Sequence, residues 1–142
     1  MKVRKIIYVI LVVGCLFGFV TWINNTLNVG HIASKCESQV RETIDPNALQ
    51  TWATNLLAAY TPGATNWGIP PYPGLAHIWK DPPSVYISVA VDREESFVCV
   101  RWGGGTVGHW GIAIGRASFV PEIPEHGSQL WIPGVYFWRN FH

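Results

Sequence analysis

Two side chains in this sequence are of the types that carry out nucleophilic catalysis together, the thiol of Cys36 and the imidazole of His109. A cysteine is an effective nucleophile when its thiolate lies at a helix N-terminus, within hydrogen-bonding reach of an imidazole. Cys36 precedes a helical stretch, and His109 opens a strand predicted over 110–114. No acidic residue stands near His109 in the sequence to orient its ring. The first interpretation of His109 is therefore a hydrogen-bonded structural histidine.

The surroundings of His109 can be deduced from strand alternation, which places it on the same face as Gly111 and Ala113. The bulky even-numbered side chains of 110–114 occupy the opposite face and should form the core. The face of His109 is left open by small side chains. This pattern predicts either a shallow groove or a place where a loop packs closely.

The cysteines Cys36 and Cys99 offer a second interpretation, because a pair outside the cytoplasm tends to oxidise. A disulfide bond between them would stabilise the fold by roughly 4 kcal/mol. The alternative is two buried free thiols, since cysteine is readily buried. If the bond forms, Cys36 cannot act as a nucleophile.

Other sites find less support. The segment 103–108 matches G-x-G-x-x-G and comes after a predicted strand, but a dinucleotide site also requires a helix to begin there. The next residues, 109–115, have the pattern of a strand, so we expect a glycine-rich turn with positive φ angles. The histidines show no metal-binding spacing, and neither a metal nor another cofactor is expected. They are His31, His77, His109, His126 and His142.

Three tryptophans lie in regions predicted as loops, Trp67, Trp79 and Trp131. Each is a candidate for an exposed platform that stacks on sugars or anchors a partner protein. The alternative for each is a place in the core or beneath a loop. The expected partner is therefore an unknown protein or glycan.

The composition excludes two classes of protein. Hydrophobic residues make up 49% of the chain and charged residues only 13%, which is not the composition of a disordered protein. The net charge is +1, but residues 24–142 hold seven Lys and Arg against nine Asp and Glu. The outer part is thus slightly acidic, and nucleic acid is not an expected partner.

The N-terminal segment has the pattern of a membrane anchor. Lys2, Arg4 and Lys5 form a basic flank in residues 1–5, and residues 6–23 are uncharged. As a helix these 18 residues span roughly 27 Å, close to the thickness of the bilayer core. The positive-inside rule then places the N-terminus in the cytoplasm and residues 24–142 outside it, in a single-pass protein of the cell membrane.

Two alternatives compete with an uncleaved anchor. A cleaved signal peptide needs small residues in an A-x-A pattern, and none occurs between Thr21 and Lys35. Lipidation at Cys15 is loosely supported by the preceding Val-Gly, but the residues directly after Cys15 are still apolar. All three interpretations put the C-terminal domain on the same side of the membrane.

Helical periodicity is found in two segments after the anchor. Residues 31–44 carry a narrow apolar stripe, which predicts a short helix or a continuation of the anchor. Asp45-Pro46 begins a second helix with a broad apolar face, and Trp52 at its centre is expected to be buried against a sheet. Residues 61–84 contain six prolines and several aromatic residues, which predicts an ordered loop.

The C-terminal half alternates with a period of two, and polar residues 92–95 make a turn within it. The predicted strands are 85–91, 97–102, 110–114 and 135–139, with 119–120 as a short extra one. Short connections favour an antiparallel meander. The predicted fold is α+β, with a transmembrane helix followed by one or two helices packed on a four- to five-stranded antiparallel sheet.

Three segments carry a resemblance to a set of small uncharacterised bacterial membrane-anchored proteins. They are DPxxLQxWAxNLL at 45–57, GGGxxGHWG at 103–111 and WIPGVYF at 131–137. The resemblance spans most of the outer domain. It implies a shared fold and brings no activity with it.

The stretch His109–Gly115 also resembles the H-x-G-I-x-[IL]-G strand of papain-like cell-wall peptidases of the NlpC/P60 type. This local similarity implies a hydrolase in which His109 is the general base and Cys36 is the nucleophile. Cys36 lacks the Asp-Cys-Ser-Gly context of that family. A membrane-anchored domain with a binding or structural role is therefore the leading prediction, and a Cys-His hydrolase acting on cell-wall peptide is the alternative.

Overall fold

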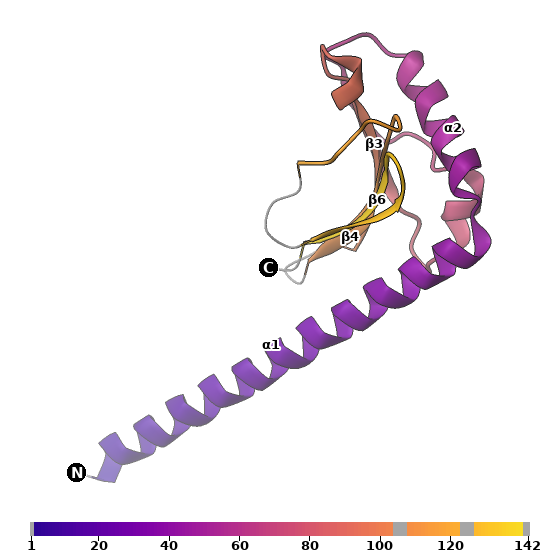
Figure 1. Ribbon diagram of the computed structural model, residues 1–142. Coiled ribbons are helices and arrows are strands. Elements are labelled where there is room, and N and C mark those ends of the chain that lie inside the picture. Colours follow the sequence, from indigo (N-terminus) through magenta and orange to yellow (C-terminus); the bar gives the residue numbers. More distant parts are fainter. Residues whose placement is uncertain (1, 104–107, 123–126, 141–142) are drawn as a thin grey trace.

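The computed structural model describes residues 2–103, 108–122 and 127–140 (Figure 1). It has the α+β architecture expected from the sequence, an apolar N-terminal helix and a second helix packed on an antiparallel sheet. The helices are α1 (Lys2–Thr43), α2 (Pro46–Ala58), and the short 3₁₀ helices η1 (Pro73–His77) and η2 (Arg93–Glu95). The strands are β1 (Thr65–Trp67), β2 (Ser84–Ser88), β3 (Phe97–Gly103), β4 (His109–Gly115), β5 (Ser128–Ile132) and β6 (Val135–Asn140).

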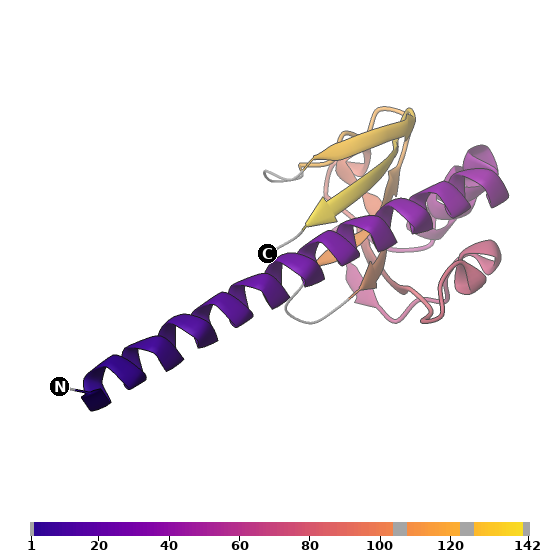
Figure 2. The ribbon, with the colours of Figure 1, turned by 90° about the horizontal axis from the view of Figure 1, so that it is seen from below.

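The helix α1 joins two predicted elements, the anchor and the stripe at 31–44, into one continuous helix. Its N-terminal half projects away from the domain with its large apolar side chains exposed (Figures 1 and 2). By length and composition this helix is suited to cross a membrane. Gly30 costs about 1 kcal/mol relative to alanine but does not break the helix. Packing of the following turns on the sheet offsets that cost.

The C-terminal third of α1 is a core helix. Ala33, Cys36, Val40 and Ile44, the last just beyond its end, recur at three- and four-residue intervals, and all four side chains are buried. They belong to the same hydrophobic cluster as the sheet. One helix therefore serves both as an apolar projection and as a layer of the domain.

The helix α2 begins where the sequence predicts. The carboxylate of Asp45 accepts a hydrogen bond from the backbone N–H of Asn47 at 2.9 Å, and proline occupies the first turn. The fully buried positions are Leu49, Ala53 and Leu57. Trp52 is only half-buried, so the expectation of a tryptophan buried against the sheet is wrong. Its ring meets Tyr72 edge-on, with the ring centroids 5.9 Å apart, because position 52 lies at the flank of the buried face.

The sheet has six strands in the order β1-β2-β3-β4-β6-β5, and all neighbouring strands are antiparallel. The four principal predicted strands are present, but the sheet is wider than expected because β1 and β5 form its edges. The residues 119–120 are not a strand, since the backbone N–H of Phe119 closes a turn on the carbonyl of Arg116. The chain leaves β4, makes the edge strand β5 and returns to place β6 beside β4. The topology is therefore not a simple meander.

The register divides the sheet into two faces with different surroundings. We call the face covered by α1 and α2 the inner face; it carries the bulky residues of the core cluster. These include Val85, Ile87, Val98, Val100, Trp102, Trp110, Ile112, Ile114, Val135 and Phe137. We call the opposite face the outer face, on which Cys99 pairs with Ala113 and Ala113 with Tyr136. Figures 1 and 2 show both helices on the same side of the strands.

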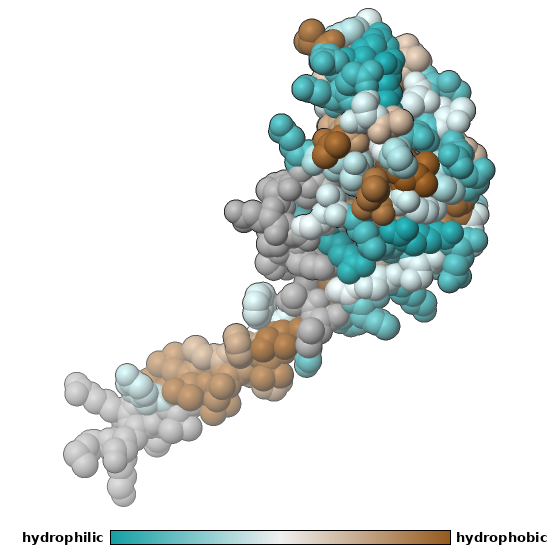
Figure 3. Space-filling model, in the orientation of Figure 1, coloured by the Kyte–Doolittle hydropathy of each residue, from teal (hydrophilic) through white to brown (hydrophobic). Residues whose placement is uncertain are grey.

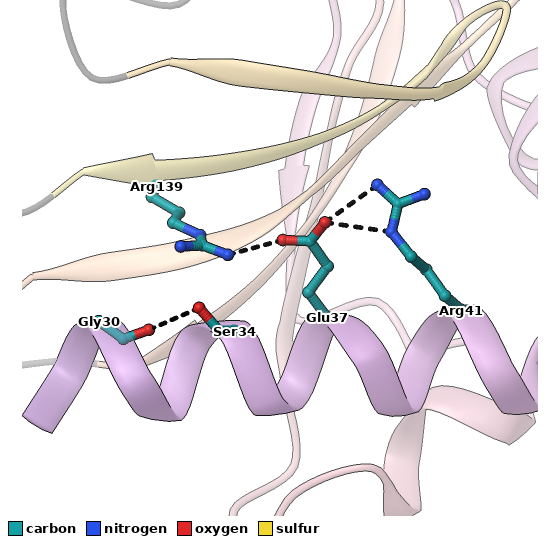
Figure 4. A network of polar contacts seen from close by, with 5 residues as sticks. All are labelled: Gly30, Ser34, Glu37, Arg41 and Arg139. Atoms are coloured by element: carbon teal, nitrogen blue, oxygen red, sulfur yellow. Dashed lines mark hydrogen bonds and ion pairs between the residues drawn. The ribbon is translucent and has the colours of Figure 1, made fainter.

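A carboxylate joins α1 to β6. The Glu37 side chain, only 11% exposed, accepts two hydrogen bonds from Arg41 at 2.9 and 3.1 Å and one from Arg139 at 2.8 Å (Figure 4). The guanidinium of Arg41 in turn lies over the rings of Phe137 and Trp131, 4.6 and 5.7 Å from their centroids. Because Glu37 neutralises charges from both elements, it fixes how the helix sits on the sheet.

We predict that Glu37→Gln lowers the free energy of unfolding by about 2 kcal/mol, since two arginines lose a charged acceptor in a half-buried position. Chemical denaturation of the full chain in detergent micelles, followed by tryptophan fluorescence, measures the change. Glu42→Gln is the matched control, because Glu42 is exposed on the same helix. An equal loss in both variants would show that Glu37 has no special part in docking α1.

Candidate functional site

The sheet separates Cys36 from His109. Cys36 is 1% exposed and lies on the inner side, where its thiol contacts Trp110. Because Trp110 and His109 are consecutive in β4, the side chain of His109 points to the outer face. Cys36 also lies in the interior of α1 rather than at a helix N-terminus. The structure therefore does not bring the predicted nucleophile and base together.

Of the two interpretations of Cys36 and Cys99, the structure shows buried free thiols and no disulfide bond between them. Cys99 pairs with Ala113 on the outer face, so the thickness of the sheet lies between the two sulfurs. Burial raises the pKa of Cys99 to about 11, although a hydrogen bond with Tyr86 partly opposes the shift. At neutral pH Cys99 is a protonated thiol and a poor nucleophile.

His109 lies half-buried at the start of β4, opposite Gly103 of β3 and Asn140 of β6. Within the part of the chain that the structure describes, its Nδ1 atom is buried and has no hydrogen-bond partner. Gly103 has a φ of +82°, as expected for a glycine-rich turn, while residues 104–107 lie outside the described residues. A strand rather than a helix comes after this turn, so the geometry of a dinucleotide site is not present at His109.

The three candidate tryptophans lie in different places and do not form one platform. Trp67 is 58% exposed on the edge strand β1. Trp79 is half-buried and packs against the core cluster. Trp131 is half-buried beside Phe137, with ring centroids 5.2 Å apart. Trp79 and Trp131 thus follow the alternative, a place packed against the core, and of the three only Trp67 presents most of its surface.

A row of aromatic rings crosses the outer face. Trp67 stacks on Tyr86 at a centroid distance of 4.4 Å, and Tyr86 meets Phe97 edge-on at 6.0 Å. Phe97 stacks on Phe119 at 5.5 Å, and Phe119 meets Tyr136 edge-on at 6.2 Å. The row joins β1, β2, β3, the segment after β4, and β6. No local pattern in the sequence predicts this row, because its members become neighbours only through the strand register.

The small residues beside His109 have the role that alternation predicts. A Cβ atom at Gly111 would collide with the carbonyl oxygen of Val100 and would lie 2.9 Å from Cζ2 of Trp138. Glycine at this position therefore allows the indole of Trp138 to lie close to the sheet. Further along the same face, Cys99 and Ala113 leave space between Trp138 and Phe119. The groove is one of the two predicted outcomes, while the close contacts at Gly111 come from the neighbouring strands β3 and β6 and not from a loop.

This space is an open groove of about 780 Å³, within the range of small-ligand sites. Its floor includes Cys99 and Ala113, and the segment 118–122 forms one side. Aromatic rings make much of its wall, and four carboxylates line it. The aromatic residues are Tyr86, Phe97, Phe119 and Trp138; the acidic ones are Asp92, Glu94, Glu95 and Glu122. We call it the outer groove and regard it as the candidate binding site.

No metal site is found in the described part of the chain, where no three His, Cys, Asp or Glu side chains are grouped to hold an ion. Of the five histidines, His126 and His142 lie outside the described residues. His31 and His77 belong to two different helices, α1 and η1. The groups that line the outer groove are aromatic rings, carboxylates, hydroxyls, the thiol of Cys99 and the amide of Asn140.

We predict that Cys36 and Cys99 react slowly with a maleimide in the folded chain at pH 7 and quickly after denaturation. Cys36 is inaccessible, and the raised pKa of Cys99 keeps its reactive thiolate scarce until the pH approaches about 11. Mass spectrometry of a Cys15→Ser variant, labelled without reductant, counts the modified thiols. Two labels after denaturation are expected, whereas none would reveal a disulfide bond.

Comparisons of the chain with known protein families, with curated proteins and with solved structures find no match. The resemblance of 45–57, 103–111 and 131–137 to small bacterial membrane-anchored proteins accordingly stays a prediction. The ligand class of the outer groove must therefore be inferred from the geometry and charge of the groove itself.

Proposed function

We propose that this chain is a single-pass protein of the cell membrane whose outer domain binds a ligand in the outer groove. In this proposal residues 6–23 cross the bilayer, residues 1–5 stay in the cytoplasm and residues 24–142 form the domain outside it. Three basic residues ahead of an uncharged span support this orientation. The exposed apolar side chains along the N-terminal half of α1 support the membrane location.

The observation that carries the binding role is the contrast between the two faces of the sheet. The inner face is filled by α1 and α2, which bury its apolar side chains. On the outer face, Tyr86, Phe97 and Trp138 are only half-buried and surround an open space of about 780 Å³. An open concave wall of rings beside a few polar groups is the usual form of a ligand site.

Binding is favoured over catalysis by the placement of the reactive groups. Cys99 in the groove carries a pKa of about 11, and Cys36 lies on the other side of the sheet from His109. A cysteine hydrolase needs its thiol and imidazole in hydrogen-bonding contact. The hydrolase alternative therefore gains no support from this geometry.

Because α1 is continuous, it sets the distance between the proposed membrane span and the outer domain. From the end of the predicted span at Ile23 to the first side chain packed against the core, Val29, a helix rises about 9 Å. The outer domain would thus stand close to the membrane surface at a set height. A tethered site of this kind reaches ligands near the membrane.

We expect a reporter fused after His142 to be active only if it functions outside the cytoplasm. The basic flank of residues 1–5 should keep the N-terminus inside, and the single span then exports the rest. Paired fusions to a phosphatase that works only outside and a fluorescent protein that folds only inside make the measurement. Fluorescence of the second fusion would contradict the topology.

We expect Ala90→Trp to block the outer groove, since Ala90 lines it and a large ring there would occupy the ligand space. The test uses NMR of the full chain in lipid nanodiscs, with mixtures of basic, neutral and acidic peptides and oligosaccharides. At least one class should shift the signals of Tyr86, Phe97 and Trp138 in the wild type but not in Ala90→Trp.

Val91→Trp is the matched control, because Val91 is the next residue, is 88% exposed and does not line the groove. This variant should bind as the wild type does. The proposed function is overturned if no mixture shifts the groove signals, or if Ala90→Trp leaves the shifts unchanged.

A further inference from the structure

All the charged residues that line the outer groove in the described part of the chain are acidic. Four carboxylates line it, and its described lining contains no lysine, arginine or histidine. Two of the four have structural partners: Glu94 binds Arg116 and Ser118, and Asp92 caps the backbone N–H at the start of η2. Arg116 balances the charge of Glu94, whereas Asp92 keeps its charge while it caps η2, and the other two carboxylates have no structural partner among the described residues.

Glu95 and Glu122 are those two. Both are exposed, and no ion pair or hydrogen bond involves their side chains in the described part of the chain. Glu95 belongs to η2 on the hairpin after β2, and Glu122 ends the segment that forms the side of the groove. The groove therefore offers unpaired carboxylates from two different parts of the fold.

The aromatic wall complements the same kind of ligand. The faces of Tyr86, Phe97 and Trp138 carry partial negative charge and attract cations, and their apolar surfaces accept aliphatic chains. Lysine and arginine combine a long aliphatic stem with a cationic head. The stem fits the wall of rings and the head fits the carboxylates, so the side chain of a basic residue matches both features.

The length of the groove suits a polypeptide. Its lining includes alternate residues of β2 and beyond, Tyr86, Ser88, Ala90 and Asp92. At about 3.3 Å per residue this row is roughly 20 Å long, enough for about six residues of an extended chain. Ser88 and Asn140 add polar groups along the way that can hydrogen-bond a peptide backbone.

We infer that the outer groove binds an extended, basic polypeptide segment, with lysine or arginine side chains between Glu95 and Glu122. This inference rests on the proposed function and names its ligand class. The carboxylate end of the groove, at η2, is the end of the domain farthest from the N-terminal half of α1 (Figure 1). Figure 3 shows hydrophilic residues at that end and the apolar helix at the other. The basic segment therefore approaches from the side away from the membrane.

The test is a titration of the full chain in nanodiscs of phosphatidylcholine, a zwitterionic lipid that does not itself attract basic peptides. The probe is a hexapeptide of alternating Lys and Thr, capped at both ends, and its partner is the same peptide with Gln in place of Lys. Calorimetry gives the affinities, and the NMR signals of Tyr86, Phe97 and Trp138 locate the binding. The Lys peptide should bind at least about tenfold more tightly than the Gln peptide.

The double variant Glu95→Gln/Glu122→Gln should weaken binding of the Lys peptide about tenfold and reduce its dependence on salt, since both charges are lost. Glu42→Gln, on the exposed side of α1, removes one charge outside the groove and should change the affinity less than about twofold. A double variant that binds as the wild type does would overturn the inference.

The outcomes distinguish this inference from the proposed function. If both peptides shift the groove signals with equal affinity, the groove binds ligands but does not select a basic segment. The same conclusion holds if a neutral oligosaccharide binds there and neither peptide does. If no ligand of any class shifts the groove signals, the proposed function fails as well.

Discussion

The docking of α1 on the inner face of the sheet is the interaction on which the rest of this structure depends. The buried stripe of Ala33, Cys36 and Val40 covers the strands, and Glu37 links the helix to Arg139 of β6. Because the same helix continues into the apolar N-terminal half, the core layer and the apolar projection form one element. The inner face is thereby used for packing, whereas the outer face keeps an open groove.

Strand alternation then decides which side chains can act together. In β4, Trp110 faces α1 and His109 faces the other way, so the thiol of Cys36 and the imidazole cannot meet. The same rule places Cys99 among the rings of the outer face and away from Cys36. The sheet thus separates Cys36 from His109 and from Cys99. Their positions in the sequence had left both a catalytic dyad and a disulfide bond open.

An element of this fold can be predicted from the sequence when its residues show a clear capping signal or a clear hydrophobic period. The helix α2 and the strands β2, β3, β4 and β6 can be deduced from capping and from clear periodicity. The edge strands are different: β1 is exposed along its whole length and β5 is mostly exposed, so neither shows the alternation of a half-buried strand. The outer groove was foreseen only as an open face at Gly111 and Ala113. Its walls come from residues that meet through the register, which no local pattern reveals.

The unbroken course of α1 has a mechanical consequence. This helix of 42 residues is about 63 Å long and unbroken, so in the proposed membrane-anchored arrangement the domain could not turn independently of the N-terminal half of the helix. Membrane helices commonly tilt by about 20°, and a tilt of this size about Ile23 would swing the far end of α1 sideways by about 10 Å. Changes in bilayer thickness alter the tilt of a helix, so they would also change the direction in which the outer groove opens. In the proposed arrangement, the lipid environment would therefore influence the orientation of the outer groove.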